Sequence, residues 1–171
     1  MENKSSLRRF AIIFVLTAAL VLSASCGAKN PYKEKSKTTV SDQAEVKVFM
    51  TVEVTGERAI KINMENKGEH TVMYGNPYIL EYRYGGEWYQ VPFKNGHAFT
   101  MEGRILGPAE EYAKPDPEGM KIDNTSSDEV RLEEVGKLSK GHYRMIKEFS
   151  VLDDEDGSVK KNFNIAAEFD L

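Results

Sequence analysis

The stretch "YILEYRYGGEWYQV", residues 78–91, decides the fold because it predicts both a β-hairpin and its register. Two runs rich in aromatic and aliphatic residues flank Gly85 and Gly86. Two adjacent glycines favour a two-residue turn, since both can adopt a positive φ without a Cβ clash. The cross-strand pairs expected around this turn are Tyr84 with Glu87, Arg83 with Trp88, Tyr82 with Tyr89, and Leu80 with Val91.

The register of this hairpin determines which face of the sheet carries Trp88, the only tryptophan. Because side chains alternate along a strand, Leu80 and Tyr82 share the better core face, and Trp88 shares the opposite face with Arg83. Arg83 can then lie over the indole, and Trp88, Arg83 and Tyr84 form the candidate contact surface for a partner. A three-residue turn is the alternative, in which Tyr84 pairs with Trp88 and the one-residue slip turns the indole inward.

Short runs typical of β-strands also fill the rest of the chain from residue 46. Apolar and polar residues alternate within these runs, and no run sustains the period of an amphipathic helix. About seven to nine short strands in a single domain at residues 46–171 predict an all-β sandwich. The strands are expected at residues 46–54, 59–66, 78–84, 87–91, 98–106, 120–124, 130–135, 142–151 and 162–171.

The stretch "KLSKGHYRMI", residues 137–146, resembles a tyrosine corner. Tyr143 stands at the entrance to a late strand, Gly141 can make the corner, and Leu138 can pack inward. Together with the hairpin, "GRILGPAEE" and the terminal "AEFDL", this stretch makes residues 46–171 similar to the bacterial immunoglobulin-like domain found on lipoproteins of low-GC Gram-positive bacteria. The resemblance implies an extracytoplasmic immunoglobulin-like β-sandwich without catalytic residues. An acidic, proline-rich insertion at residues 107–129 departs from the family pattern.

Cys26, the only cysteine, lies in "LSASCG", residues 22–27. A basic start and an apolar run of about twelve residues precede it, which is the layout of an export signal and is shorter than a membrane-spanning helix. The stretch before the cysteine resembles the lipobox of bacterial lipoproteins, with its large aliphatic residue four positions before the cysteine instead of three. The resemblance implies that residues 1–25 are a lipoprotein signal peptide and that Cys26 carries diacylglycerol. An unprocessed signal anchor is the alternative.

Residues 26–45 are expected to join the anchor to the domain as a flexible linker. The segment has almost no large apolar side chains, so it cannot bury enough surface to offset its ordering entropy. Its lysines, at positions 29, 33, 35 and 37, lie close enough to the anchor to touch anionic headgroups, although a soluble spacer is the alternative. Two acyl chains give stable anchoring, which predicts a protein on the extracytoplasmic face of the cell membrane.

The charge of the chain argues against a nucleic-acid partner. The formal net charge is −4, and removal of residues 1–25, with three basic residues and one glutamate, leaves about −6. Binding to nucleic acid is driven by cations that neutralise phosphates. We therefore expect no nucleic-acid partner for this acidic, exported protein.

The sequence contains no recognisable catalytic or metal-binding constellation. His70, His97 and His142 have no second ligand at the spacing typical of zinc sites. The acidic stretch "DDEDG", residues 153–157, fails the EF-hand template because apolar residues fall at two ligand positions when it is aligned on its glycine. No G-x-S-x-G motif is present. We expect a protein that is not an enzyme and needs no cofactor or metal.

Two classes of function remain. The first is a binding module that presents loops or a sheet face to a protein, a peptide or an envelope glycan. The second is an accessory domain that spaces or supports another envelope component and has no ligand of its own. The aromatic residues concentrated around Trp88 favour the binding module.

Overall fold

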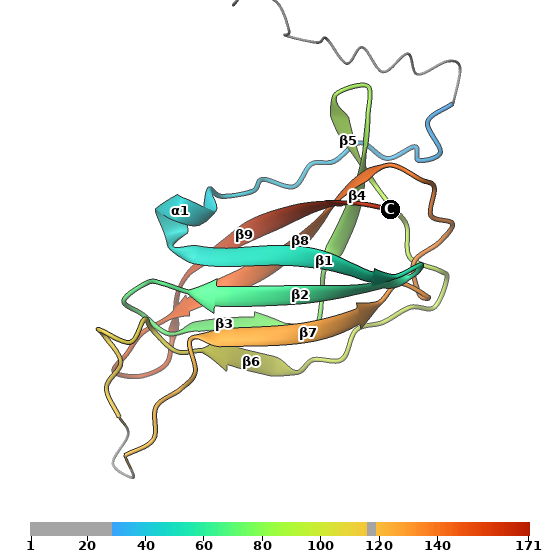
Figure 1. Ribbon diagram of the computed structural model, residues 1–171. Helices are drawn as coiled ribbons and strands as arrows, with labels where there is room; N and C mark the ends of the chain where they lie inside the picture. Colours follow the sequence, from blue (N-terminus) through green and yellow to red (C-terminus); the bar gives the residue numbers. More distant parts are fainter. Residues whose placement is uncertain (1–28, 116–118) are drawn as a thin grey trace, which may run out of the picture.

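The computed structural model describes residues 29–115 and 119–171, which contain nine β-strands and one short helix (Figure 1). Cys26 and the predicted signal peptide lie outside these residues. The elements are α1 (Gln43–Val46), β1 (Val48–Gly56), β2 (Ala59–Asn66), β3 (Val72–Gly75), β4 (Ile79–Tyr84), β5 (Glu87–Gln90), β6 (Gly103–Leu106), β7 (Thr125–Arg131), β8 (His142–Leu152) and β9 (Val159–Asp170).

The strands form two antiparallel sheets that face each other (Figure 1). One sheet has three strands in the order β1-β2-β7. The other has six strands, in which β5-β4-β8-β3-β6 follow one another and β9 also pairs with β8. Strands β4 and β3 pair with successive parts of the long strand β8. This arrangement confirms the predicted immunoglobulin-like β-sandwich. Among the described residues, no helix is long and apolar enough to span a membrane.

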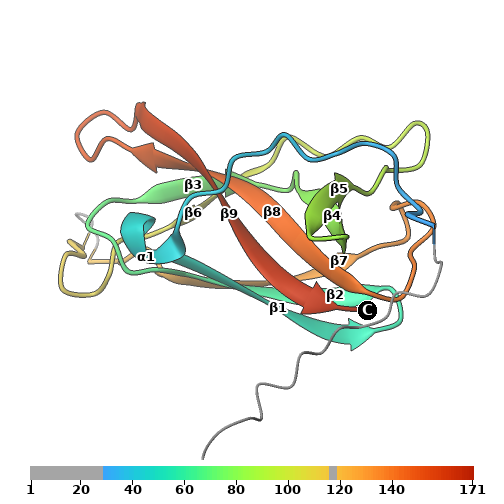
Figure 2. The ribbon, with the colours of Figure 1, turned by 90° about the horizontal axis from the view of Figure 1, so that it is seen from above.

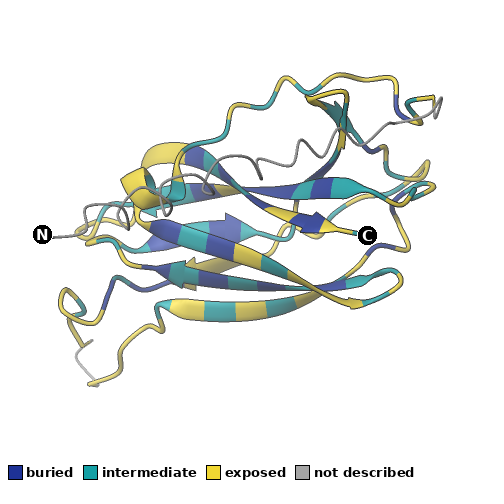
Figure 3. Ribbon diagram, turned by 45° about the horizontal axis from the view of Figure 1, so that its top comes forward, coloured by how far each residue is buried: buried dark blue, intermediate teal, exposed yellow. Residues whose placement is uncertain are grey.

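The core lies between the two sheets because each sheet has one apolar face. Ile60, Ile62 and Met64 of β2 point inward and are each at most 2% exposed. Tyr143 and Phe149 of β8 are fully buried against them within the same cluster. Figure 3 shows this alternation as bands of buried and exposed residues along the strands. Full burial of one such side chain contributes roughly 1.5–3 kcal/mol, so the core supplies most of the stability.

The hairpin of β4 and β5 has the predicted register. Tyr82 pairs with Tyr89, and Arg83 pairs with Trp88. The two turn glycines adopt φ angles of 59° and 86°, which are strained for any residue with a Cβ. The glycine pair therefore fixes a two-residue turn, and the alternative three-residue turn does not form.

Three strand predictions differ from the structure, and one strand was missed. Of the strand predicted at residues 98–106, only Gly103–Leu106 forms a strand, β6. Residues 120–124 form a loop, not a strand, and Met120 and Ile122 within it are exposed. Strand β7 starts at Thr125, before the strand predicted at residues 130–135, and it pairs along the whole of β2 with mostly polar side chains. Strand β3 was not predicted, since four residues are too few to show a period. It pairs with β6 and β8, which lie far from it in the sequence, so local sequence does not indicate this pairing.

Residues 29–42, called the N-terminal strap below, lie along the six-stranded sheet (Figure 2). Tyr32 is only 7% exposed and belongs to the core cluster. The Ser36 amide donates to the carbonyl of Trp88, and the Gln90 amide donates to the carbonyl of Glu34, both at 2.8 Å. The strap thus adds an antiparallel segment to the edge of β5.

The strap then reaches the opposite edge of the same sheet. The Ser41 amide donates to the carbonyl of Asn164 in β9 at 2.8 Å, and the Gln43 side chain donates to the carbonyl of Ala166 at 2.7 Å. Edge strands carry unpaired backbone groups, which these contacts satisfy. Residues 29–45 therefore differ from the predicted flexible linker. Backbone hydrogen bonds and the one buried ring of Tyr32 hold these residues in place. The low average hydrophobicity of the segment, on which the linker prediction rested, does not reveal either interaction.

Candidate binding surfaces

Tyr143 has the contacts of a tyrosine corner. Its ring is fully buried, and its hydroxyl donates to the carbonyl of Ser139 at 2.5 Å. The same oxygen accepts from the Ser139 amide at 3.0 Å. Burial is the main reason that the pKa of Tyr143 lies well above its usual range. The phenol therefore stays neutral and fixes the backbone four residues upstream of itself.

Gly141 and Leu138 complete this corner. Gly141 adopts a φ of 150°, and a Cβ added there would lie 2.5 Å from Cε2 of Tyr82. No larger residue fits without displacing the Tyr82 ring, whose centroid lies 5.1 Å from that of Tyr143. Leu138 is half-buried and packs against the core. These three residues stabilise the fold through these contacts.

Trp88 lies on the outer face of its sheet, but its indole is partly covered. The guanidinium of Arg83 lies 5.7 Å from the indole centroid, and that of Arg144 lies 4.5 Å away. The His142 ring is 5.7 Å from the indole, and the N-terminal strap pairs with the Trp88 backbone. Tyr84 stands beside the turn of the same hairpin. The structure thus brings Trp88 and Arg83 together, and it leaves less free aromatic surface than the sequence suggests.

Arg144 also forms a buried ion pair beneath this surface. Its Nε and Nη2 atoms each lie 2.7 Å from Oε2 of Glu81, its cross-strand partner. The Glu81 side chain is fully buried, and that of Arg144 is 14% exposed. Oε1 of Glu81 has no hydrogen-bond partner within the described part of the chain. A half-satisfied buried carboxylate depends strongly on its one cation, so Arg144 stabilises the fold.

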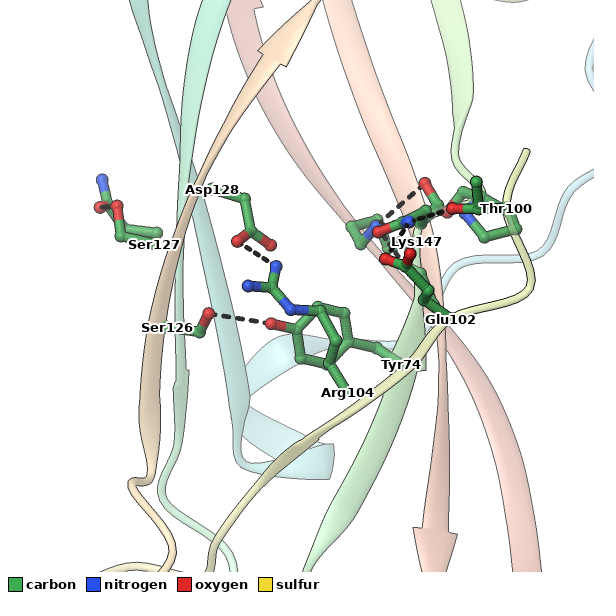
Figure 4. A network of polar contacts seen from close by, with 12 residues as sticks. Tyr74, Thr100, Glu102, Arg104, Ser126, Ser127, Asp128 and Lys147 are labelled. Atoms are coloured by element: carbon green, nitrogen blue, oxygen red, sulfur yellow. Dashed lines mark hydrogen bonds and ion pairs between the residues drawn. The ribbon is translucent and has the colours of Figure 1, made fainter. Parts of the chain in front are cut away.

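A second polar network links the edges of the two sheets (Figure 4). Arg104 of β6 forms an ion pair with Asp128 of β7, and the Tyr74 hydroxyl donates to that of Ser126 at 2.9 Å. Strands β6 and β7 are the neighbouring edges of the sandwich, since each ends its own sheet. Charged side chains on such edges oppose pairing with other chains. We therefore assign this network to closure of the sandwich.

Lys147 is an interior cation that supports the same region (Figure 4). It points inward from β8 and is only 4% exposed. Its ammonium donates to the carbonyls of Gly75 at 2.7 Å and Pro77 at 3.3 Å, where the chain crosses from β3 to β4. Burial lowers the pKa of Lys147 to about 8. Its hydrogen bonds satisfy backbone carbonyls that have no strand beside them, so its role is structural.

The histidines and the acidic turn do not form a metal site within residues 29–115 and 119–171. His142 lies between Glu168 at 2.7 Å and Asp170 at 2.9 Å, and hydrogen bonding to these carboxylates raises its pKa. His97 packs between aromatic rings, with the Phe93 centroid 4.5 Å away. In the acidic stretch, Asp153 pairs with Lys160 at 2.9 Å, as in a solvated turn.

The outer face of the three-stranded sheet carries an open depression of about 630 Å³. Two cross-strand rows of side chains line it. Thr51, Asn63 and Ser127 form one row. The other row contains Phe49, Glu65 and Thr125. The Ser127 hydroxyl donates to Oδ1 of Asn63 at 2.9 Å, which fixes the orientation of the amide.

The charges within this depression are nearly balanced. Glu65 is its one carboxylate, and Lys67 lies 3.2 Å from it. The Lys67 ammonium also lies 5.1 Å from the centroid of the Phe49 ring. Hydroxyl, amide and aromatic groups therefore dominate the surface. Such a surface can form hydrogen bonds with a flat polar ligand.

Part of the chain matches a known family. The family model of the bacterial Ig-like domain matches residues 41–115. This span includes α1 and strands β1 to β6. The match and the observed sandwich together support a bacterial Ig-like domain, a class of domain that is typically non-catalytic. No curated protein matches the chain.

Two features of this domain were not predicted from the sequence. The depression was missed because threonine, serine and asparagine on a sheet face look like ordinary solvated residues. The alternation that places Thr51 outward was visible, but the neighbour relation with Ser127 required the pairing of β2 with β7. The burial of Lys147 could have been recognised from the sequence, because alternation along the strand places it on the same face as Tyr143 and Phe149.

Proposed function

We propose that this protein is an extracytoplasmic lipoprotein whose Ig-like domain is a non-catalytic binding module on the cell membrane. The lipobox resemblance at residues 22–27 supports an anchor at Cys26. The depression on the three-stranded sheet supports binding, because it is the surface at which neutral polar side chains and an aromatic ring converge. An accessory spacer is the second candidate, and the partial covering of Trp88 by Arg83 and Arg144 favours it.

We expect the Cys26→Ser variant to lose lipid attachment and signal cleavage completely. The thiol is the only group in the lipobox-like stretch that can carry diacylglycerol, and a serine hydroxyl is a much weaker nucleophile. Metabolic labelling with a fatty-acid analogue in the producing bacterium measures the attachment. Ser25→Ala, which keeps a small residue before the cysteine, is the matched control and should label normally. Equal label on wild type and Cys26→Ser would exclude the anchor.

An envelope glycan is the ligand that best fits the depression. Its lining presents the hydroxyls of Thr51 and Ser127 and the amide of Asn63, which match sugar hydroxyl groups. The Phe49 ring adds an apolar platform for a sugar ring. The balanced charge of Glu65 and Lys67 does not favour a strongly charged ligand. A glycan strand can also lie along an open face that gives little enclosure.

We expect the double variant Thr51→Val/Asn63→Ala to reduce glycan binding about ten-fold or more, since each lost hydrogen bond weakens binding by about 1 kcal/mol. The measurement is co-sedimentation of the purified chain of residues 26–171, with Cys26→Ser, with isolated cell-wall glycan. Asn162→Ala, an exposed asparagine on β9, is the control and should bind as wild type does. Unchanged binding by the double variant would exclude the depression as the site. No binding by wild type would favour the accessory role.

A further inference from the structure

The strap shortens the tether between the proposed anchor and the folded domain. Tyr32 is buried, and its amide is already bonded to the side chain of Asn30 at 3.0 Å. Residues 27–31 alone separate Cys26 from this fixed point. A fully extended chain spans at most about 3.3–3.6 Å per residue, so the connection reaches roughly 20 Å. This argument rests on the proposed lipid at Cys26, and it places one end of the sandwich close to the membrane.

The end of the sandwich that carries Tyr32 can be identified from its contacts. The Tyr32 hydroxyl donates to the carbonyl of Lys137 at 2.8 Å, so the strap begins beside the loop that precedes β8. Gly141 exchanges backbone hydrogen bonds of 3.0 Å with Leu171, which places the C-terminus at the same end. The turn between β8 and β9 lies at the opposite end (Figures 1 and 2).

The two ends of the sandwich differ in charge. Residues 29–37 contain four lysines and one glutamate, and Lys137 and Lys140 are exposed beside them. The turn between β8 and β9 contains four consecutive acidic residues, 153–156. Glu133 and Glu134 are exposed in the same loop as Lys137 and Lys140. Two other carboxylates at this end are paired. Glu87 lies 3.1 Å from Lys35, and Asp170 lies 2.9 Å from His142.

We infer that the end carrying Tyr32 docks on an anionic phospholipid surface through Lys29, Lys33, Lys137 and Lys140. A short tether keeps these ammonium groups within reach of the headgroups, where each lysine strengthens membrane binding by about five-fold at low salt. The acidic turn at residues 153–156 then points away from the bilayer. The outer face of the three-stranded sheet runs between the two ends and stays accessible from the side.

Lysine footprinting on vesicles tests this orientation. The mature chain, residues 26–171, is coupled through the Cys26 thiol to a maleimide phospholipid in vesicles. The vesicles contain either phosphatidylcholine alone or phosphatidylcholine with phosphatidylglycerol. Amine labelling is then read by mass spectrometry. We expect labelling of the four docking lysines to fall about five-fold on the anionic vesicles. Labelling of Lys121 and Lys161, which are exposed outside the docking surface, should not change.

Two variants separate docking from simple crowding at the membrane. Lys137→Glu/Lys140→Glu should restore labelling at Lys29 and Lys33, whereas the matched pair Lys121→Glu/Lys161→Glu should not. Equal labelling on both kinds of vesicle, or protection of Lys121 and Lys161 as well, would overturn the proposed orientation. Because the coupling to Cys26 is chemical, these results do not depend on whether cells lipidate Cys26. The metabolic label reports that step separately.

Discussion

The Arg144→Met variant should lose about 3–5 kcal/mol of stability. Removal of the guanidinium leaves the fully buried Glu81 carboxylate without a cation. Its Oε1 atom already has no hydrogen-bond partner within the described residues, so no second donor compensates. An exposed ion pair would cost about 1 kcal/mol or less, and burial is what makes this loss larger. Urea unfolding of the purified domain measures the difference.

Two further variants assign the loss to the unpaired charge. Arg83→Met removes the other guanidinium near Trp88 and should cost only about 0.5–1 kcal/mol, the value of an exposed cation–π contact. The double variant Glu81→Leu/Arg144→Met should recover most of the stability, because an apolar pair can replace a buried ion pair at little cost. A loss below about 1 kcal/mol for Arg144→Met would mean that water reaches Glu81.

The register of the β4–β5 hairpin and the bounds of β2 were predicted correctly from local sequence. The hairpin register follows from Gly85 and Gly86, because a two-residue turn leaves one pairing for the flanking strands. The bounds of β2 match the predicted residues 59–66, since alternation there coincides with a buried face. The glycine pair lies directly between the two strands whose register it determines, and the alternation lies within β2 itself.

Features that depend on distant partners could not be predicted in this way. Ser126 and Asp128 face the sandwich from β7, so Val130 is the one apolar side chain on the inner side of this strand, too few for a hydrophobic alternation. The N-terminal strap is held by the edges of β5 and β9, which composition cannot reveal. The depression likewise combines residues from three strands, and their register had to be known first.

The tyrosine corner was expected from one short motif, and the observed contacts show which groups its hydroxyl satisfies. A phenol carries one proton, and Tyr143 donates it to the carbonyl of Ser139. Tyr32 donates its own proton to the carbonyl of Lys137, so the 3.3 Å contact between the two phenol oxygens adds little. The hydroxyl of Tyr143 therefore stabilises the fold mainly through the two backbone groups of Ser139.

We expect Tyr143→Phe to destabilise the domain by about 1–3 kcal/mol, because the Ser139 amide and carbonyl both lose their partner. The ring stays in place, so loss of packing does not contribute. Ser139 is half-buried, and water can partly replace the phenol, which keeps the loss below that of Arg144→Met. Tyr89→Phe is the matched control. It removes a half-buried phenol of the same sheet and should change stability by about 0.5 kcal/mol or less. If both variants unfold at the same urea concentration as wild type, the corner hydrogen bonds contribute nothing, and the buried Tyr143 ring alone accounts for the motif.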